Sequence, residues 1–189
     1  MKQRQQLGFL SIGLSLAACV LSLLSGGCGY SATRLLPAEY RTIYIEPFEN
    51  KIAINRDVSE REGFQTNLPL IEEQVTRAVI DRFFFDGNLR VTNKMERADL
   101  IMTGTLRDFF RQQVRRTAND STTEEYRLNL VGSLSVRKQD VSIIVDEPNL
   151  IGDATYFVTG ISATSETAAV INLIADFSRR VVERVVENW

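Results

Sequence analysis

Two long stretches of alternating apolar and polar residues, separated by a turn, most constrain what this chain can fold into. The first begins at Ala98 and is predicted to run to Arg116, and the second runs from Tyr126 to Val136. Successive side chains of a strand point to opposite faces, so this two-residue period predicts β-strands. Residues 118–123, ANDSTT, are of types that favour turns. We therefore expect one long antiparallel hairpin.

A turn centred near residues 119–121 sets which residues of the hairpin lie opposite one another. It would place Arg111 opposite Asn129 and Arg107 opposite Ser133, so the odd-numbered residues of both strands would share one face. The even-numbered face carries the large apolar side chains and is expected to belong to the core: Leu100, Met102, Leu106, Phe110, Tyr126, Leu128, Leu130, Leu134 and Val136.

Two amphipathic helices are predicted on either side of the hairpin. The first is expected to follow an N-cap at Asn67, with Pro69 in its first turn, and to end at Gly87. The second is expected to span about 164–187. The apolar face of the first consists of Ile71, Val75, Ala78, Val79 and Phe83, and that of the second of Ala168, Ile171, Ala175, Val182 and Val185.

The remaining segments complete a sheet. Residues 41–48 have the composition of a strand, and residues 89–92 are expected to form a short one. Weaker strands are expected at 141–145 and 155–159, around the turn-rich residues 146–149. Residues 49–67 are expected to form a long loop, whose role the sequence leaves open. These elements predict an α+β fold, a two-layer sandwich with two amphipathic helices packed on one face of a mixed, largely antiparallel β-sheet.

The N-terminus has a basic head, an apolar run from Leu7 to Leu24 and small residues that end in Cys28. This order is typical of a secretory leader, and the cysteine makes it resemble a bacterial lipoprotein signal. We therefore expect residues 1–27 to be a signal peptide and the Cys28 thiol to carry a diacylglycerol. One alternative is an uncleaved membrane helix. The other is cleavage before Cys19, which would leave apolar residues 20–24 in the mature protein.

Cleavage before Cys28 would leave a lipidated N-terminus and tether at 28–37 and a single periplasm-side domain at 38–189. Without Lys2 and Arg4 of the leader, 20 of the 22 basic residues remain against 24 acidic ones, a net charge near −4. This balance argues against a general nucleic-acid-binding protein. The two cysteines lie in the leader and at the anchor, so no disulfide is expected in the mature fold.

The chain has no histidine. This excludes a Ser-His-Asp or Cys-His catalytic pair and any His-ligated metal site. The sequence also has no GxxxxGK[ST] or GxGxxG motif that would hold a phosphate. We therefore expect a protein that is not an enzyme and has no cofactor besides the covalent lipid on Cys28.

Several segments, in this order, resemble one family. They are Cys28-Gly29-Tyr30, residues 43–50 (IYIEPFEN), residues 98–104 (ADLIMTG) and a terminal helix that ends in Trp189. Their order and spacing are similar to those of the LptE family of lipopolysaccharide-assembly lipoproteins, over essentially the whole mature chain.

The resemblance implies an outer-membrane lipoprotein without enzymatic activity. LptE-like proteins sit as a plug inside the lumen of the LptD β-barrel, support its assembly and take part in the insertion of lipopolysaccharide into the outer leaflet. The implied partners are an LptD-type barrel, lipopolysaccharide and the membrane that holds the lipid anchor. The alternative is an auxiliary lipoprotein or pilotin of another envelope transport or secretion system, which would hold its partner through a sheet edge or groove.

The odd-numbered face of the hairpin is a candidate binding surface. Few acidic residues besides Glu125 accompany its arginines. Arginine binds phosphate through two parallel hydrogen bonds, so this face suits the phosphates of lipid A. The alternative is an ordinary solvated face of a one-sided sheet. With Phe109, the candidate lipopolysaccharide-binding residues on this face are Arg107, Arg111, Arg115, Arg127 and Arg137.

Overall fold

The computed structural model describes residues 36–37, 39–53, 68–116 and 123–187. The expected signal peptide, both cysteines and most of the tether lie outside the described residues. So do the Asn67 cap, most of the expected 49–67 loop and most of the hairpin turn.

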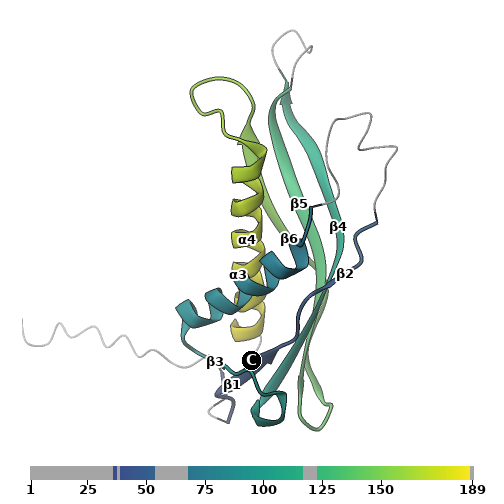
Figure 1. Cartoon of the computed structure of the whole chain (residues 1–189), viewed down its shortest axis with the longest axis vertical. Helices are drawn as coiled ribbons and strands as arrows, with labels where there is room; N and C mark the ends of the chain where they lie inside the picture. Colours follow the sequence, from purple (N-terminus) through teal and green to yellow (C-terminus); the bar gives the residue numbers. More distant parts are fainter. Residues whose placement is uncertain (1–35, 38, 54–67, 117–122, 188–189) are drawn as a thin grey trace, which may run out of the picture. The chain divides into compact units, whose positions relative to one another are not determined.

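Six strands form one mixed sheet in the described part of the chain, in the order β3-β1-β4-β5-β6, with β2 also paired to β4. The strands β1 (Thr42–Ile45), β2 (Glu49–Asn50) and β3 (Arg90–Val91) are short and make parallel pairs. The long strands β4 (Leu100–Arg116), β5 (Thr123–Lys138) and β6 (Ile143–Phe157) are antiparallel. Figure 1 shows these three long strands side by side. The predicted hairpin is therefore confirmed as β4 and β5.

Two helices cover the sheet. They are α3 (Ile71–Asp86) and α4 (Glu166–Glu187), and a short 3-10 helix, η1 (Met95–Arg97), precedes β4. Both helices contribute to one hydrophobic core with the sheet, and Figure 1 shows α3 crossing α4. The predicted two-layer α+β fold is confirmed.

The apolar face of α3 agrees with its helical period. Ile71, Val75, Val79 and Phe83 are buried, and Ala78 is half-buried. The helix ends at Gly87, whose φ of 75° is left-handed, and its N–H donates to the carbonyl of Phe83.

The start of α3 differs from the prediction, because the helix begins later and its cap residue makes no side-chain hydrogen bond to the helix. The Ile71 N–H donates to the Leu68 carbonyl, and the cap residue is Leu70 with a left-handed φ of 57°. Pro69 lies in this turn and not in the helix, which begins at Ile71.

The predicted face of α4 is partly wrong. Val182 and Val185 are buried, but Ala175 and Ile171 are exposed. The larger apolar side chains recur at helical spacing from Ala169 to Val186, and this more apolar face packs on the sheet. Ile171 instead lines a groove of about 700 Å³ between α3 and α4. The buried face consists of Ala169, Leu173, Ile174, Phe177, Val181, Val182, Val185 and Val186.

The prediction of two weak strands around a turn at 146–149 is also wrong, because β6 runs unbroken from Ile143 to Phe157. Pro148 lies inside it. Proline has no N–H, but it is tolerated on an edge strand or at a bulge. Here β6 is the last strand of the sheet, and the β5–β6 register shifts at this point, between Gly132/Leu134 and Leu150/Glu147.

A second bulge changes the faces of the hairpin. The β4–β5 register shifts between Leu106 and Asp108, so Arg107 has no direct partner and Arg111 lies opposite Leu128 instead of Asn129. One extra residue in a strand reverses the faces of the residues that follow. Phe109 is therefore buried and Phe110 is 40% exposed, the opposite of the prediction.

Candidate functional site

The five candidate arginines do not share one face. The register shifts of β4 divide them into one on the helix-covered face, one within a bulge and three on the outer face, which we define as the sheet face opposite the helices. The prediction of a single arginine face is wrong because it assumed an unbroken two-residue alternation along β4.

Arg111 lies on the helix-covered face and is mostly buried, with a side chain 10% exposed. Its guanidinium stands 4.3 Å from the centre of the Tyr126 ring, and its Nη1 lies 3.4 Å from Oε2 of Glu166. Tyr126 stacks on Tyr156, whose hydroxyl donates to the same carboxylate at 3.0 Å. Burial raises the pKa of Tyr156. This cluster joins the hairpin to the first turn of α4, so Arg111 is placed to hold the fold together.

Arg107 occupies the β4 bulge. Its Nη1 donates a hydrogen bond of 2.6 Å to the carbonyl of Pro148. The sheet order puts β5 between these two strands, so the side chain reaches across β5. Arg107 therefore links the irregular positions of β4 and β6.

The outer face carries Arg115, Arg127 and Arg137, whose side chains are 62%, 45% and 26% exposed. Their nearest carboxylate oxygens are those of Glu125 at 3.8 Å, and of Asp153 and Glu46 at 4.0 Å. These distances are longer than the donor–acceptor distance of a hydrogen bond. Such exposed pairs contribute only about 0–1 kcal/mol. The three guanidiniums are thus free of hydrogen bonds to those carboxylates and can donate to an added anionic group.

Two of these carboxylates were missed from the sequence. Glu46 follows β1 and Asp153 lies in β6, so both reach the outer face only through strand pairings with distant parts of the chain. One of the two could have been found from the sequence. A prediction of one continuous edge strand across 146–149 would have placed Asp153 beside β5.

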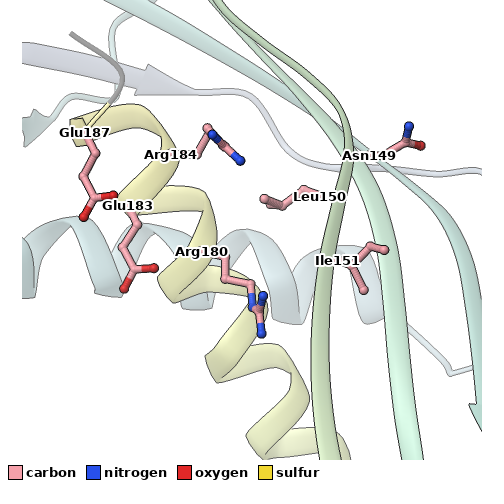
Figure 2. Close-up of a pocket in the computed structure, with 7 residues that line it drawn as sticks. All are labelled: Asn149, Leu150, Ile151, Arg180, Glu183, Arg184 and Glu187. Atoms are coloured by element: carbon pink, nitrogen blue, oxygen red, sulfur yellow. The ribbon is translucent and has the colours of Figure 1, made fainter.

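A pocket of about 470 Å³ lies between α4 and β6 (Figure 2). An ion pair joins the two elements on each side of it, Arg184 to Glu147 at 3.0 Å and Arg180 to Asp153 at 2.8 Å. The pocket lining contains two basic and two acidic residues, so it has no net charge with which to select an ion. Its lining residues are Asn149, Leu150, Ile151, Arg180, Glu183, Arg184 and Glu187.

Asp176 organises this side of α4. Its carboxylate accepts the β6 backbone N–H of Asp153 at 3.0 Å and the Nε of Arg180 at 2.7 Å, and it pairs with Arg179. Partial burial alone would raise the pKa of Asp176, but these hydrogen bonds outweigh it and hold the pKa below its usual range. Asp176 thereby covers part of the free edge of the sheet, where an unpaired N–H could recruit another strand.

Two searches of the described residues bear on function. Among them, no group of three or more Asp, Glu, Cys or His side chains could hold a metal ion. No helix in that part of the chain is long and apolar enough to cross a membrane.

The comparison with protein families decides the family. A model described as "LptE: Lipopolysaccharide-assembly" matches residues 40–187, nearly the whole of the α+β domain. The chain belongs to the LptE family. Of the segments that resemble LptE in the sequence, residues 43–50 correspond to β1 and β2, residues 98–104 to the start of β4 and the terminal helix to α4. Residues 28–30 lie outside the described part of the chain. The protein is accordingly an envelope lipoprotein of lipopolysaccharide assembly, from a family that is not enzymatic.

Solved structures show weaker likenesses. A minor lipoprotein from Acinetobacter baumannii is 12% identical with a TM-score of 0.48, and covers 79% of this chain and 94% of its own. Rare lipoprotein B from Shewanella oneidensis is 10% identical with a TM-score of 0.42, and covers 73% and 92%. Because these scores lie below 0.5, they add nothing to the LptE assignment. A search of curated proteins found no significant match.

Proposed function

We propose that this LptE-family lipoprotein is held in the outer membrane by the lipid on Cys28 and acts as the plug of an LptD-type β-barrel. In this role it supports barrel assembly and takes part in the insertion of lipopolysaccharide into the outer leaflet. The observation that carries the proposal is the family match over residues 40–187. The packed core and the two helices braced on the sheet support it, since a plug must keep its shape.

The barrel partner is tested by co-purification. The protein is isolated with a C-terminal tag from detergent-solubilised outer membrane, and the proteins that remain bound are identified. We expect an LptD-type barrel. Recovery of a secretin or a transporter in its place would contradict the plug and support the alternative, an auxiliary lipoprotein or pilotin.

For lipopolysaccharide itself, we propose the outer-face arginines as the contacts. Arg115 and Arg127 are exposed, and Arg137 lies on the same face. Their ion pairs are too long to be hydrogen bonds, so a lipid A phosphate would gain charge-assisted bonds without breaking strong ones. Arg107 and Arg111 already form hydrogen bonds within the fold. We therefore propose that these two act indirectly, by positioning the region that binds lipopolysaccharide.

The double variant Arg115→Ala/Arg127→Ala tests these contacts. Loss of two charge-assisted contacts should weaken binding to purified lipopolysaccharide by about tenfold or more, which is about 1.4 kcal/mol. The affinity for lipopolysaccharide should also depend less on salt concentration in this variant, because fewer charges take part in binding. The matched control is Lys51→Ala/Arg77→Ala, which removes two exposed cations elsewhere. Equal binding by both double variants would show that the outer-face arginines serve only solubility.

The anchor is tested by mass spectrometry of the mature N-terminus. We expect an acylated Cys28 and, in the Cys28→Ala variant, an unprocessed or soluble product. Two or three long acyl chains hold a protein on a bilayer almost permanently, because each buried CH₂ contributes about 0.8 kcal/mol. An acylated Cys19 would contradict this choice of site.

A further inference from the structure

The end of α3 exposes two large aromatic side chains. Phe83 is completely buried in the core, whereas the next two residues, Phe84 and Phe85, are 66% and 80% exposed. Burying a phenylalanine side chain stabilises a fold by about 1.5–3 kcal/mol, and these two exposed side chains do not contribute that stabilisation. Exposed apolar groups that lie together typically mark a surface that contacts another molecule.

The chain that continues from these aromatics is basic. Residues 82–97, from the last turn of α3 through β3 to η1, contain four basic and two acidic residues in a protein with a net charge of −2. Arg90, Lys94 and Arg97 are exposed. No ion pair within the described residues involves these three, whereas the arginines of α4 and of the outer face all have carboxylate partners.

The point at which the chain enters the domain lies beside this surface. Leu36 is buried, and soon after it the carbonyl of Arg41 accepts the N–H of Arg90, so β1 begins next to β3 (Figure 1). Eight residues lead from Cys28 to Leu36, and even a fully extended chain of that length spans only about 28 Å. An acylated Cys28 would therefore keep this edge of the sheet close to the bilayer.

We propose that Phe84, Phe85, Arg90, Lys94 and Arg97 form a membrane-facing surface, which rests on the phospholipid leaflet that holds the Cys28 acyl chains. Aromatic and aliphatic side chains bury themselves at the boundary between headgroups and acyl chains, and cations lie at the phosphates. The guanidinium of Arg82 lies 5.1 Å from the centre of the Phe85 ring, so a cation also lies beside an exposed aromatic side chain within α3. The surface rests on the proposed acylation of Cys28, and it orients the tethered domain on the leaflet before the domain enters the barrel as its plug.

Depth measurements on the full-length, acylated protein test this surface. Acylation occupies the thiol of Cys28, so a Phe85→Cys variant can carry one nitroxide label. The protein is bound to vesicles of phosphatidylethanolamine and phosphatidylglycerol. Compared with a label on a water-exposed control residue, we expect the label at position 85 to collide several-fold less often with a water-soluble nickel complex and more often with oxygen. The control is Ile161→Cys, at an exposed apolar residue outside this surface. Equal accessibility of the two labels would overturn the proposal.

Charge reversal provides a second readout. Lys94→Glu/Arg97→Glu should move the label at position 85 towards water in phosphatidylglycerol vesicles, whereas Lys51→Glu/Arg77→Glu should leave its depth unchanged. Flotation of the vesicles separates the two hypotheses. Protein that fails to float contradicts the Cys28 anchor, and protein that floats with a water-exposed label contradicts only the membrane-facing surface.

Discussion

The side chains of Thr42 and Asp99 each hydrogen-bond the backbone of the other and also bond one another. The Asp99 carboxylate accepts the N–H of Thr42 at 2.9 Å and its hydroxyl at 2.8 Å, and the hydroxyl accepts the Asp99 N–H at 3.0 Å. The Arg41 N–H also donates to this carboxylate. These bonds join the starts of β1 and β4, which gives a structural reason for Asp99 in the segment that resembles LptE.

Replacement of this carboxylate should make stability less dependent on acid. Partial burial would raise the pKa of Asp99, but its hydrogen bonds outweigh that effect and hold the pKa below the ordinary value of 3.8. A lowered pKa adds stability that is present above pH 3.8 and is lost as the pH falls through the folded value. Asp99→Asn should cost about 1–3 kcal/mol near neutral pH.

Urea unfolding as a function of pH measures this effect. The difference between wild type and Asp99→Asn should shrink in acid, and a constant difference from pH 7 down to about pH 2 would show that Asp99 does not titrate with folding. Thr42→Val is the matched partner variant, because it removes the hydroxyl at constant shape. A double-mutant cycle should give a coupling of about 0.5–3 kcal/mol.

Truncation of two adjacent phenylalanines in α3 should change stability by very different amounts. Phe83→Ala removes a completely buried ring and should cost about 3–5 kcal/mol. Phe84→Ala changes the same helix by the same atoms at an exposed position and should stay within about 0.5 kcal/mol. Thermal and urea unfolding of both variants provide the measurement. Similar losses in the two would mean that the core face of α3 is misassigned.

Arg111 should matter for folding more than for binding. Arg111→Met keeps the apolar volume but leaves the Glu166 carboxylate without its cation, and should destabilise by about 1–3 kcal/mol. Arg127→Met, on the outer face, should change stability by less than about 1 kcal/mol. Equilibrium unfolding compares the two variants. If Arg127→Met proved the more destabilising, the division of the arginines between the faces would be wrong.

Gly152 should not accept a methyl group. A Cβ at this position would lie 2.7 Å from the Cβ of Phe177 and 2.8 Å from its Cα, because the α4 backbone packs directly on β6 there. Backbone cannot move aside as a flexible side chain can, so Gly152→Ala should cost about 1–3 kcal/mol. Thr155→Ala, at an exposed position of the same strand, is the control. A melting temperature unchanged by Gly152→Ala would show that α4 and β6 can separate at no cost.

Local patterns account for the elements that the sequence predicted well. The apolar face of α3 and its end at Gly87 follow from helical spacing and a residue that accepts a left-handed φ. The β4–β5 hairpin follows from alternation over many residues, and the family from segments that lie in order along the chain. In each case neighbouring residues carry the whole signal.

Other features depended on residues that only the fold brings together. A one-residue bulge at Arg107 reverses the faces of Phe109 and Phe110, and its existence depends on the pairing of β4 with β5. Pro148 stays within a strand because β6 lies at the edge of the sheet, which no local pattern records.

The sequence by itself therefore determined that this chain is a lipoprotein-like α+β protein with a long hairpin, because periodicity and composition are local properties. Only the tertiary structure decided which arginines reach the outer face and which are held inside. That choice depends on strand register, and register is set by contacts between residues far apart in the chain.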